Sequence, residues 1–117
     1  MMNYLIVLND PPYGTERSFN GLRLALWLSK REEVSVKVFL LSDSVVCVKT
    51  GQKLPSGYYN LEVMLKKLVA RGVVIGACGV CMEARGLTDA DLIGGVHKSN
   101  MDELTDWTLE ADKVVVF

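Results

Sequence analysis

Short apolar runs along the chain predict buried strands. The runs long enough for a strand and too short for a helix lie at residues 3–9, 34–41, 73–77 and 114–117. They are rich in Val, Ile and Leu, which is typical of strands that are covered on both faces. The segment 92–96 predicts a weaker strand or a loop, because Gly94 and Gly95 interrupt its apolar residues.

Three longer segments have the apolar spacing of helices. They cover about residues 16–31, 60–71 and 100–110, and Thr15 and Ser99 are the expected N-caps of the first and the last. The middle segment carries an i, i+3, i+4, i+7, i+8 stripe, formed by Leu61, Met64, Leu65, Leu68 and Val69. The first helix is apolar around most of its circumference, which predicts burial from two sides, by the sheet and by a neighbouring subunit.

The alternation of strands and helices predicts an α/β fold. Short buried strands separated by helices form a parallel sheet with helices on both faces, so we expect a three-layer α/β/α sandwich with an open, mainly parallel sheet of about five strands. No repeat or linker divides the chain, which indicates a single domain over residues 1–117. Ligands of such sheets gather at the carboxyl ends of strands. Here those ends bring together Asn9 and Asp10, Ser42 and Asp43, and Cys78.

Composition and charge exclude several classes of protein. Half of the residues are apolar, and the mean hydropathy is +0.22, yet no run approaches the roughly 20 residues of a membrane span. The first apolar run has no basic segment before it, so we expect a cytoplasmic protein without a signal peptide. The net charge is −1 without a basic block, which argues against nucleic-acid binding.

Neither a metal nor a nucleotide cofactor is predicted. The chain has three cysteines and one histidine, and their positions, Cys47, Cys78, Cys81 and His97, match no familiar zinc-site spacing. No Gly-x-Gly-x-x-Gly follows the first strand. Cys47 lies in the apolar segment 45–48, which predicts a core position.

The third strand leads directly into a Cys-x-x-Cys. We predict that it ends at Cys78 and turns into a short helix, which stops at Gly86 in a left-handed conformation. The free N–H groups of the first helical turn would then point at Cys78, and its pKa should fall below the ordinary value of about 8.5. This placement makes Cys78 the candidate nucleophile. The alternative is a buried structural cysteine at a strand end.

Cys81 lies three residues further on, where both sulfurs can share one face of the helix. It can act as the resolving thiol of a redox pair with Cys78. A simple packing role under the first helical turn is the other interpretation, and the four-residue motif does not decide between them.

Charged residues near the same edge are candidate supporting groups. Asp10 and Asp43 are expected mainly as turn or helix caps, since a negative charge would raise the pKa of a nearby thiol. Arg85 would stabilise an anionic sulfur if its side chain reaches back along the helix, or else face solvent or another subunit. His97 is expected to be a surface or capping residue that could still assist at a strand end.

Several motifs together resemble one known family. They are Pro11-Pro12-Tyr13-Gly14-x-Glu16-Arg17, Asn20-x-Leu22-Arg23-Leu24-Ala25, Val38-Phe39-Leu40-Leu41-Ser42-Asp43, Tyr59-Asn60-Leu61, Cys78-Gly79-x-Cys81-Met82-x-Ala84-Arg85-Gly86 and Asp106-Trp107-x-x-x-Ala111-Asp112-Lys113-Val114. In this order they resemble the DsrE/DsrF-like (YchN-like, TusD-related) sulfur-relay family nearly end to end. The resemblance implies an α/β/α sandwich that assembles as a homotrimer or homohexamer, and a role in sulfur handling.

The resemblance also suggests a role for one cysteine. Sulfur-relay members carry a persulfide on a cysteine eight residues before the glycine of an Arg-Gly-hydrophobic stretch, and that position here is Cys78, before Gly86. The chain departs from those members in having Cys81, which could attack such a persulfide on Cys78 and expel hydrosulfide.

Three hypotheses follow for the function. The first is a cytoplasmic homo-oligomeric sulfur carrier, or persulfide-transfer protein, that receives sulfane sulfur on Cys78 from a donor protein and passes it to an acceptor protein. The second is a thiol–disulfide redox protein that uses Cys78 and Cys81 together. The third is a non-catalytic oligomeric binding module.

Overall fold

A five-stranded parallel sheet forms the centre of the molecule. The computed structural model describes residues 1–117. The strands are β1 (Met2–Leu8), β2 (Val34–Leu40), β3 (Val74–Cys78), β4 (Val96–Ser99) and β5 (Lys113–Val116). Their order across the sheet is β4-β3-β2-β1-β5, and every neighbouring pair is parallel. The predicted α/β class and the parallel sheet are confirmed.

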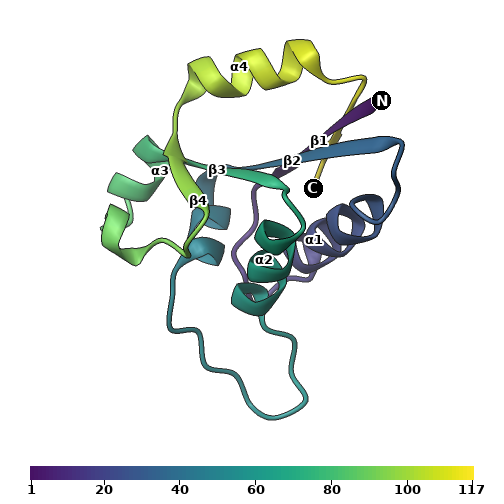
Figure 1. Ribbon diagram of the computed structural model, residues 1–117. Helices are drawn as coiled ribbons and strands as arrows, with labels where there is room; N and C mark the ends of the chain where they lie inside the picture. The colour runs from purple at the N-terminus through teal and green to yellow at the C-terminus, as the bar shows by residue number, and fades with distance from the viewer.

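Helices cover both faces of this sheet, as a three-layer sandwich requires. The α-helices are α1 (Arg17–Leu28), α2 (Leu61–Ala70), α3 (Gly79–Glu83) and α4 (Met101–Glu110), and two 3-10 helices are η1 (Ser42–Val48) and η2 (Asp89–Asp91). Figure 1 shows α1 and α2 on one side of the sheet and α4 on the other. No helix is both long enough and apolar enough to cross a membrane.

The core lies between these layers and is built from the inward faces of the predicted strands and helices. Its largest fully buried side chains are Phe39, Leu5, Ile6, Leu8, Leu22, Leu40, Leu61, Leu65, Leu68, Ile75, Met82 and Ile93. On the α4 side, the edge of Phe39 packs against Trp107 with the ring centroids 5.8 Å apart. Helix α1 approaches the sheet closely because Gly21 leaves no side chain between its backbone and Leu8.

The helix boundaries differ from the predictions at the caps. Helix α1 begins at Arg17 with Glu16 at the N-cap, and it ends at Leu28, three residues before the predicted end at residue 31. Thr15 precedes this N-cap by one residue, and its hydroxyl still accepts the backbone N–H of Arg17 at 3.4 Å. Helix α4 is capped by Asn100, whose side chain accepts the N–H of Glu103, so the prediction of Ser99 as the cap was wrong.

The fourth strand lies further along the chain than its apolar residues indicate. The prediction placed a weak strand or loop over 92–96, whereas β4 covers Val96–Ser99. Gly95 has a φ of 93° and turns the chain just before the strand. As an edge strand, β4 pairs only with β3 and contains the polar sequence Val-His-Lys-Ser, so it lacks the apolar run by which the other strands were found.

Helix α1 buries only one of its two apolar sides within the chain. Its buried residues are Ser18, Gly21, Leu22 and Ala25, whereas Trp27 is 61% exposed. The sheet therefore covers one of the two sides of α1 that the sequence predicts to be buried. Cover from a neighbouring subunit remains a prediction.

Candidate functional site

The turn from β3 into α3 places Cys78 at the carboxyl end of a central strand, as the sequence predicts. Cys78 is the N-cap of α3, and its Sγ accepts the backbone N–H of Cys81 at 3.4 Å. Only 9% of Cys78 is exposed, while Cys81 is partly exposed. Gly86 follows the helix with a φ of 69°, the left-handed conformation that its glycine predicts.

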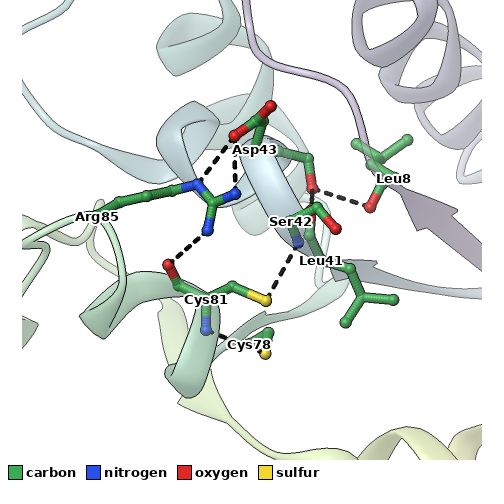
Figure 2. A network of polar contacts seen from close by, with 8 residues as sticks. Leu8, Leu41, Ser42, Asp43, Cys78, Cys81 and Arg85 are labelled. Carbon is green, nitrogen blue, oxygen red and sulfur yellow. Dashed lines mark hydrogen bonds and ion pairs between the residues drawn. The ribbon is translucent and has the colours of Figure 1, made fainter.

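The carboxyl ends of β1, β2 and β3 meet at this edge of the sheet, also as predicted. The backbone N–H of Ser44 in η1 donates to the carbonyl of Asn9, and the Ser44 hydroxyl donates to the carbonyl of Leu8 at 2.9 Å. The backbone N–H of Ser42 donates to Cys81 Sγ at 3.2 Å. Figure 2 shows the contact between Ser42 and Cys81. Together, these hydrogen bonds join the start of η1 to β1 and to α3.

Ser42 has a contact in the candidate site that sequence reasoning missed. The sequence places Ser42 at this edge of the sheet without assigning a role to it, and its backbone N–H is the donor to Cys81. Ser42 has a φ of 54° and is the only non-glycine residue with a positive φ. This conformation is uncommon for serine, so nothing in the sequence indicates it. Strained backbone of this kind concentrates at functional sites.

Arg85 reaches back from the end of α3 to η1. Its Nε and Nη2 donate to Asp43 Oδ1 at 3.0 and 2.8 Å, and its Nη1 donates to the carbonyl of Cys81 at 3.0 Å. The structure therefore brings together four of the five predicted site residues, Cys78, Cys81, Asp43 and Arg85. The charge of Asp43 is paired with Arg85.

Asp10 lies in a separate cluster in the β1–α1 turn. Its carboxylate accepts the hydroxyl of Thr15 at 3.1 Å and lies 3.9 Å from Arg17 Nε, and its carbonyl accepts the hydroxyl of Ser18. These are the contacts of a turn residue, and they include neither cysteine.

His97 also lies apart from the cysteines, in β4. Its Nε2 contacts Glu103 Oε1, which also accepts the hydroxyl of Ser99 at 2.6 Å. Burial tends to raise the pKa of Glu103, but the hydrogen bonds from Ser99 and His97 outweigh it and lower that pKa. The cluster joins β4 to α4.

The prediction of a lowered pKa for Cys78 was wrong. Burial raises the pKa of this thiol, and the neighbouring Cys81 thiol raises it further, while the N–H groups of Cys81 and Val80 act in the opposite direction without compensating. Helix α3 has only five residues, so its dipole is small, and the loss of water dominates.

Cys47 lies in the core, where the sequence predicts it. It is fully buried in η1, and burial raises the pKa of its thiol to about 12. A thiol of this kind is inert towards electrophiles at neutral pH.

The comparisons with known proteins identify the family. The profile of the DsrE/DsrF-like family matches residues 2–117. The chain belongs to this family. It is 42% identical over 118 residues to Protein YchN of Escherichia coli strain K12, and the match covers 100% of both chains. The crystal structure of that YchN protein superposes with a TM-score of 0.94 over 100% of both chains.

More distant matches are a solved structure of the same fold and a relative with a named activity. The structure of MTH1491 from Methanobacterium thermoautotrophicum is 16% identical and has a TM-score of 0.79 over 100% of both chains, a likeness of fold alone. Sulfurtransferase TusD of Salmonella typhi is 27% identical over 128 residues, covering 99% of this chain and 100% of that protein. The name of that relative states a sulfurtransferase activity.

Proposed function

We propose that this protein is a cytoplasmic homo-oligomeric sulfur carrier that holds sulfane sulfur on Cys78. The Cys78 thiolate attacks the outer sulfur of a donor protein persulfide, R–S–SH. A bond forms between Cys78 Sγ and that sulfur, the S–S bond of the donor breaks, and the electron pair leaves on the donor thiolate. An acceptor thiolate removes the sulfur by the same exchange in the next step.

The single observation that carries this proposal is the position of Cys78. It ends a central strand at the edge where ligands of parallel sheets bind, with a backbone N–H directed at its sulfur and a second thiol beside it. A buried thiol with a raised pKa reacts slowly with stray electrophiles, so it suits a carrier that is loaded inside a complex with its donor. The named activity of the relative TusD is of the same chemical class.

Loading can be tested by intact-mass spectrometry. The protein is incubated with sodium polysulfide, and an added mass of about 32 Da marks one bound sulfur atom. We expect the adduct in the Cys81→Ala variant, located on Cys78 by peptide mapping, and its loss in Cys78→Ala. Retention of the adduct in Cys78→Ala would contradict the assignment.

A thiol–disulfide redox function is the second candidate, favoured by the Cys-x-x-Cys spacing, which places both cysteines at the same turn. That function requires Cys81, whereas sulfur loading does not. Reduction of a small disulfide substrate should therefore disappear in Cys81→Ala if the redox function is correct. If the protein neither takes up sulfur nor reduces the disulfide substrate, the non-catalytic binding module is the remaining interpretation.

A groove between α1 and α2 is the proposed interface of the homo-oligomer. Exposed Trp27 and Val63 lie in it, with Arg23 and Lys67 at its rim. The outer face of α4 carries the complementary set of exposed groups, the apolar Met101 and Leu109 and the acidic Asp102 and Asp106. We propose that α4 of a second copy docks in this groove. Such a head-to-tail contact can close into a ring, such as a trimer.

Light scattering after size-exclusion chromatography measures the mass of the assembly. We expect Trp27→Lys to reduce the assembly to monomers and Glu32→Gln, at an exposed position beyond the end of the same helix, to leave it intact. An unchanged mass in Trp27→Lys would exclude this groove as the interface.

A further inference from the structure

Two sets of hydrogen bonds join α3 to η1 around Cys81. The N–H of Ser42 donates to Cys81 Sγ, and Arg85 bonds both Asp43 and the carbonyl of Cys81. We call these contacts together the η1–α3 clamp. One set fixes the sulfur of Cys81 and the other fixes its backbone, so the clamp determines where the second thiol of the site points.

The clamp directs Cys81 towards η1. In Figure 2 the sulfur of Cys81 faces the Ser42 N–H, which donates to it at 3.2 Å. The donor is a backbone group in the left-handed region, at a φ of 54°, so the chain bears conformational strain to present it there. Because the backbone of Ser42 is held in this conformation, its N–H keeps the Cys81 side chain in one rotamer.

We propose that Ser42 and Arg85 are positioning residues that keep Cys81 from discharging a persulfide on Cys78. This inference rests on the proposed sulfur-carrier function and assigns its regulation to the clamp. With the clamp closed, the bound sulfur is kept for an acceptor. With the clamp open, the Cys81 sulfur leaves the Ser42 N–H and attacks Cys78, and the bound sulfur is released as hydrosulfide.

The discharge step needs no reagent from outside. The Cys81 thiol gives its proton to solvent, and its sulfur attacks Cys78 Sγ, the inner sulfur of the persulfide. A Cys78–Cys81 disulfide bond forms, the bond from Cys78 Sγ to the outer sulfur breaks, and the electron pair leaves with the outer sulfur as hydrosulfide. The two cysteines are oxidised to the disulfide, and the sulfane sulfur is reduced.

The clamp is accessible to a partner protein. The Asp43 side chain is 61% exposed and that of Arg85 is 30% exposed. Exposed ion pairs contribute little stability, so a competing charge on a bound partner can separate them at small cost. The acceptor or another partner that contacts this edge can thus control the release of sulfur.

A matched pair of variants tests the clamp. Arg85→Gln removes the ion pair to Asp43 and weakens the bond to the Cys81 carbonyl. Glu83→Gln removes a different ion pair, between Glu83 at the end of α3 and Lys98 at 3.2 Å, which contacts neither cysteine. Each protein is loaded with polysulfide and separated from excess reagent. The persulfide is then followed by intact mass, and released hydrosulfide by a fluorescent probe.

We expect Arg85→Gln to lose the persulfide about tenfold faster than the protein without substitutions, because a charged hydrogen bond no longer holds Cys81. The product should be 2 Da lighter than the reduced protein, with one hydrosulfide released for each disulfide formed. Arg85→Lys should have a persulfide lifetime between that of Arg85→Gln and that of the protein without substitutions. Glu83→Gln should have the same lifetime as the protein without substitutions. Equal lifetimes in Arg85→Gln and Glu83→Gln would overturn the proposal.

Two further measurements separate this proposal from the carrier function. In a Cys81→Ala background, Arg85→Gln should not shorten the persulfide lifetime, and a shortened lifetime there would overturn the proposal. If no protein takes up sulfur, the carrier function fails, but the clamp is still tested by oxidation with diamide. Disulfide closure between Cys78 and Cys81 should then be faster in Arg85→Gln than in Glu83→Gln, and equal closure rates would overturn the clamp.

Discussion

The two ends of η1 provide two different environments for cysteine. Its first residue, Ser42, contacts Cys81 at the edge of the sheet, whereas Cys47 near its other end lies fully buried among apolar side chains. Burial is the largest cause that raises the pKa of both Cys47 and Cys78. What distinguishes the sheet edge is a second thiol, directed N–H groups and partial access to solvent. Reactivity therefore depends on these neighbours as well as on the pKa.

The largest expected difference between the two environments is in alkylation. In native protein, iodoacetamide should label Cys81 and Cys78, while Cys47 should react at least about 1,000-fold more slowly, because its exposure requires unfolding of the core. Peptide mass spectrometry over a time course measures all three rates. Labelling of Cys47 at the rate of Cys81 would remove the distinction.

The alkaline stability of the protein tests the burial of Cys47. Its pKa is about 12 in the folded state, above the unfolded value of about 8.5. Stabilisation by the protonated thiol is thus complete below the unfolded value and is lost as the pH rises towards the folded one. The loss is about 1.4 kcal/mol per pH unit within this range.

Urea unfolding of the unmodified protein and of Cys47→Ala at pH 7 and pH 10 measures this loss. Cys47→Ala should be less stable at pH 7, because it leaves a cavity. The difference between the two proteins should shrink at pH 10, since only the unmodified protein has the ionising thiol. A constant difference would contradict the assigned pKa.

The strain at Ser42 is expected to have a moderate effect on stability. Ser42→Gly relieves the positive φ, and we expect the free energy of unfolding to rise by about 1 kcal/mol. The parallel substitution Ser44→Gly, in the same helix, should lower it, because that hydroxyl bonds the carbonyls of Leu8 and Leu41. Destabilisation by Ser42→Gly, measured by urea unfolding, would show that the conformation carries no strain.

The smallest expected effect is the influence of one thiol on the other. Cys81 is the second cause of the raised pKa of Cys78, after burial. Cys81→Ala should therefore lower the pKa of Cys78 while leaving it above the ordinary value, and Cys47→Ala should not change it. The pH dependence of Cys78 alkylation measures this shift. An unchanged profile in Cys81→Ala would mean that burial alone sets the pKa.

The apolar patterns predicted most of the fold correctly, and the errors have identifiable causes. Strand β4 was placed too early because an edge strand does not need an apolar run. The pKa of Cys78 was predicted in the wrong direction because the helix terminus was considered and the loss of water was not. The cysteine motif located most of the candidate site, but the contact of Ser42 with Cys81 depends on a backbone angle that no residue type indicates.

The sequence by itself determined the features that depend on neighbours along the chain. The apolar runs, the stripe of α2 and the turn from β3 through Cys78 to Gly86 are of this kind, because their geometry follows from the periods of strands and helices. Only the tertiary structure decided which distant groups meet. Ser42 and Cys81 are 39 residues apart, and Arg85 and Asp43 are 42 apart. Their contacts, and the burial that raises the pKa of Cys78, exist because β2 and β3 are neighbours in the sheet.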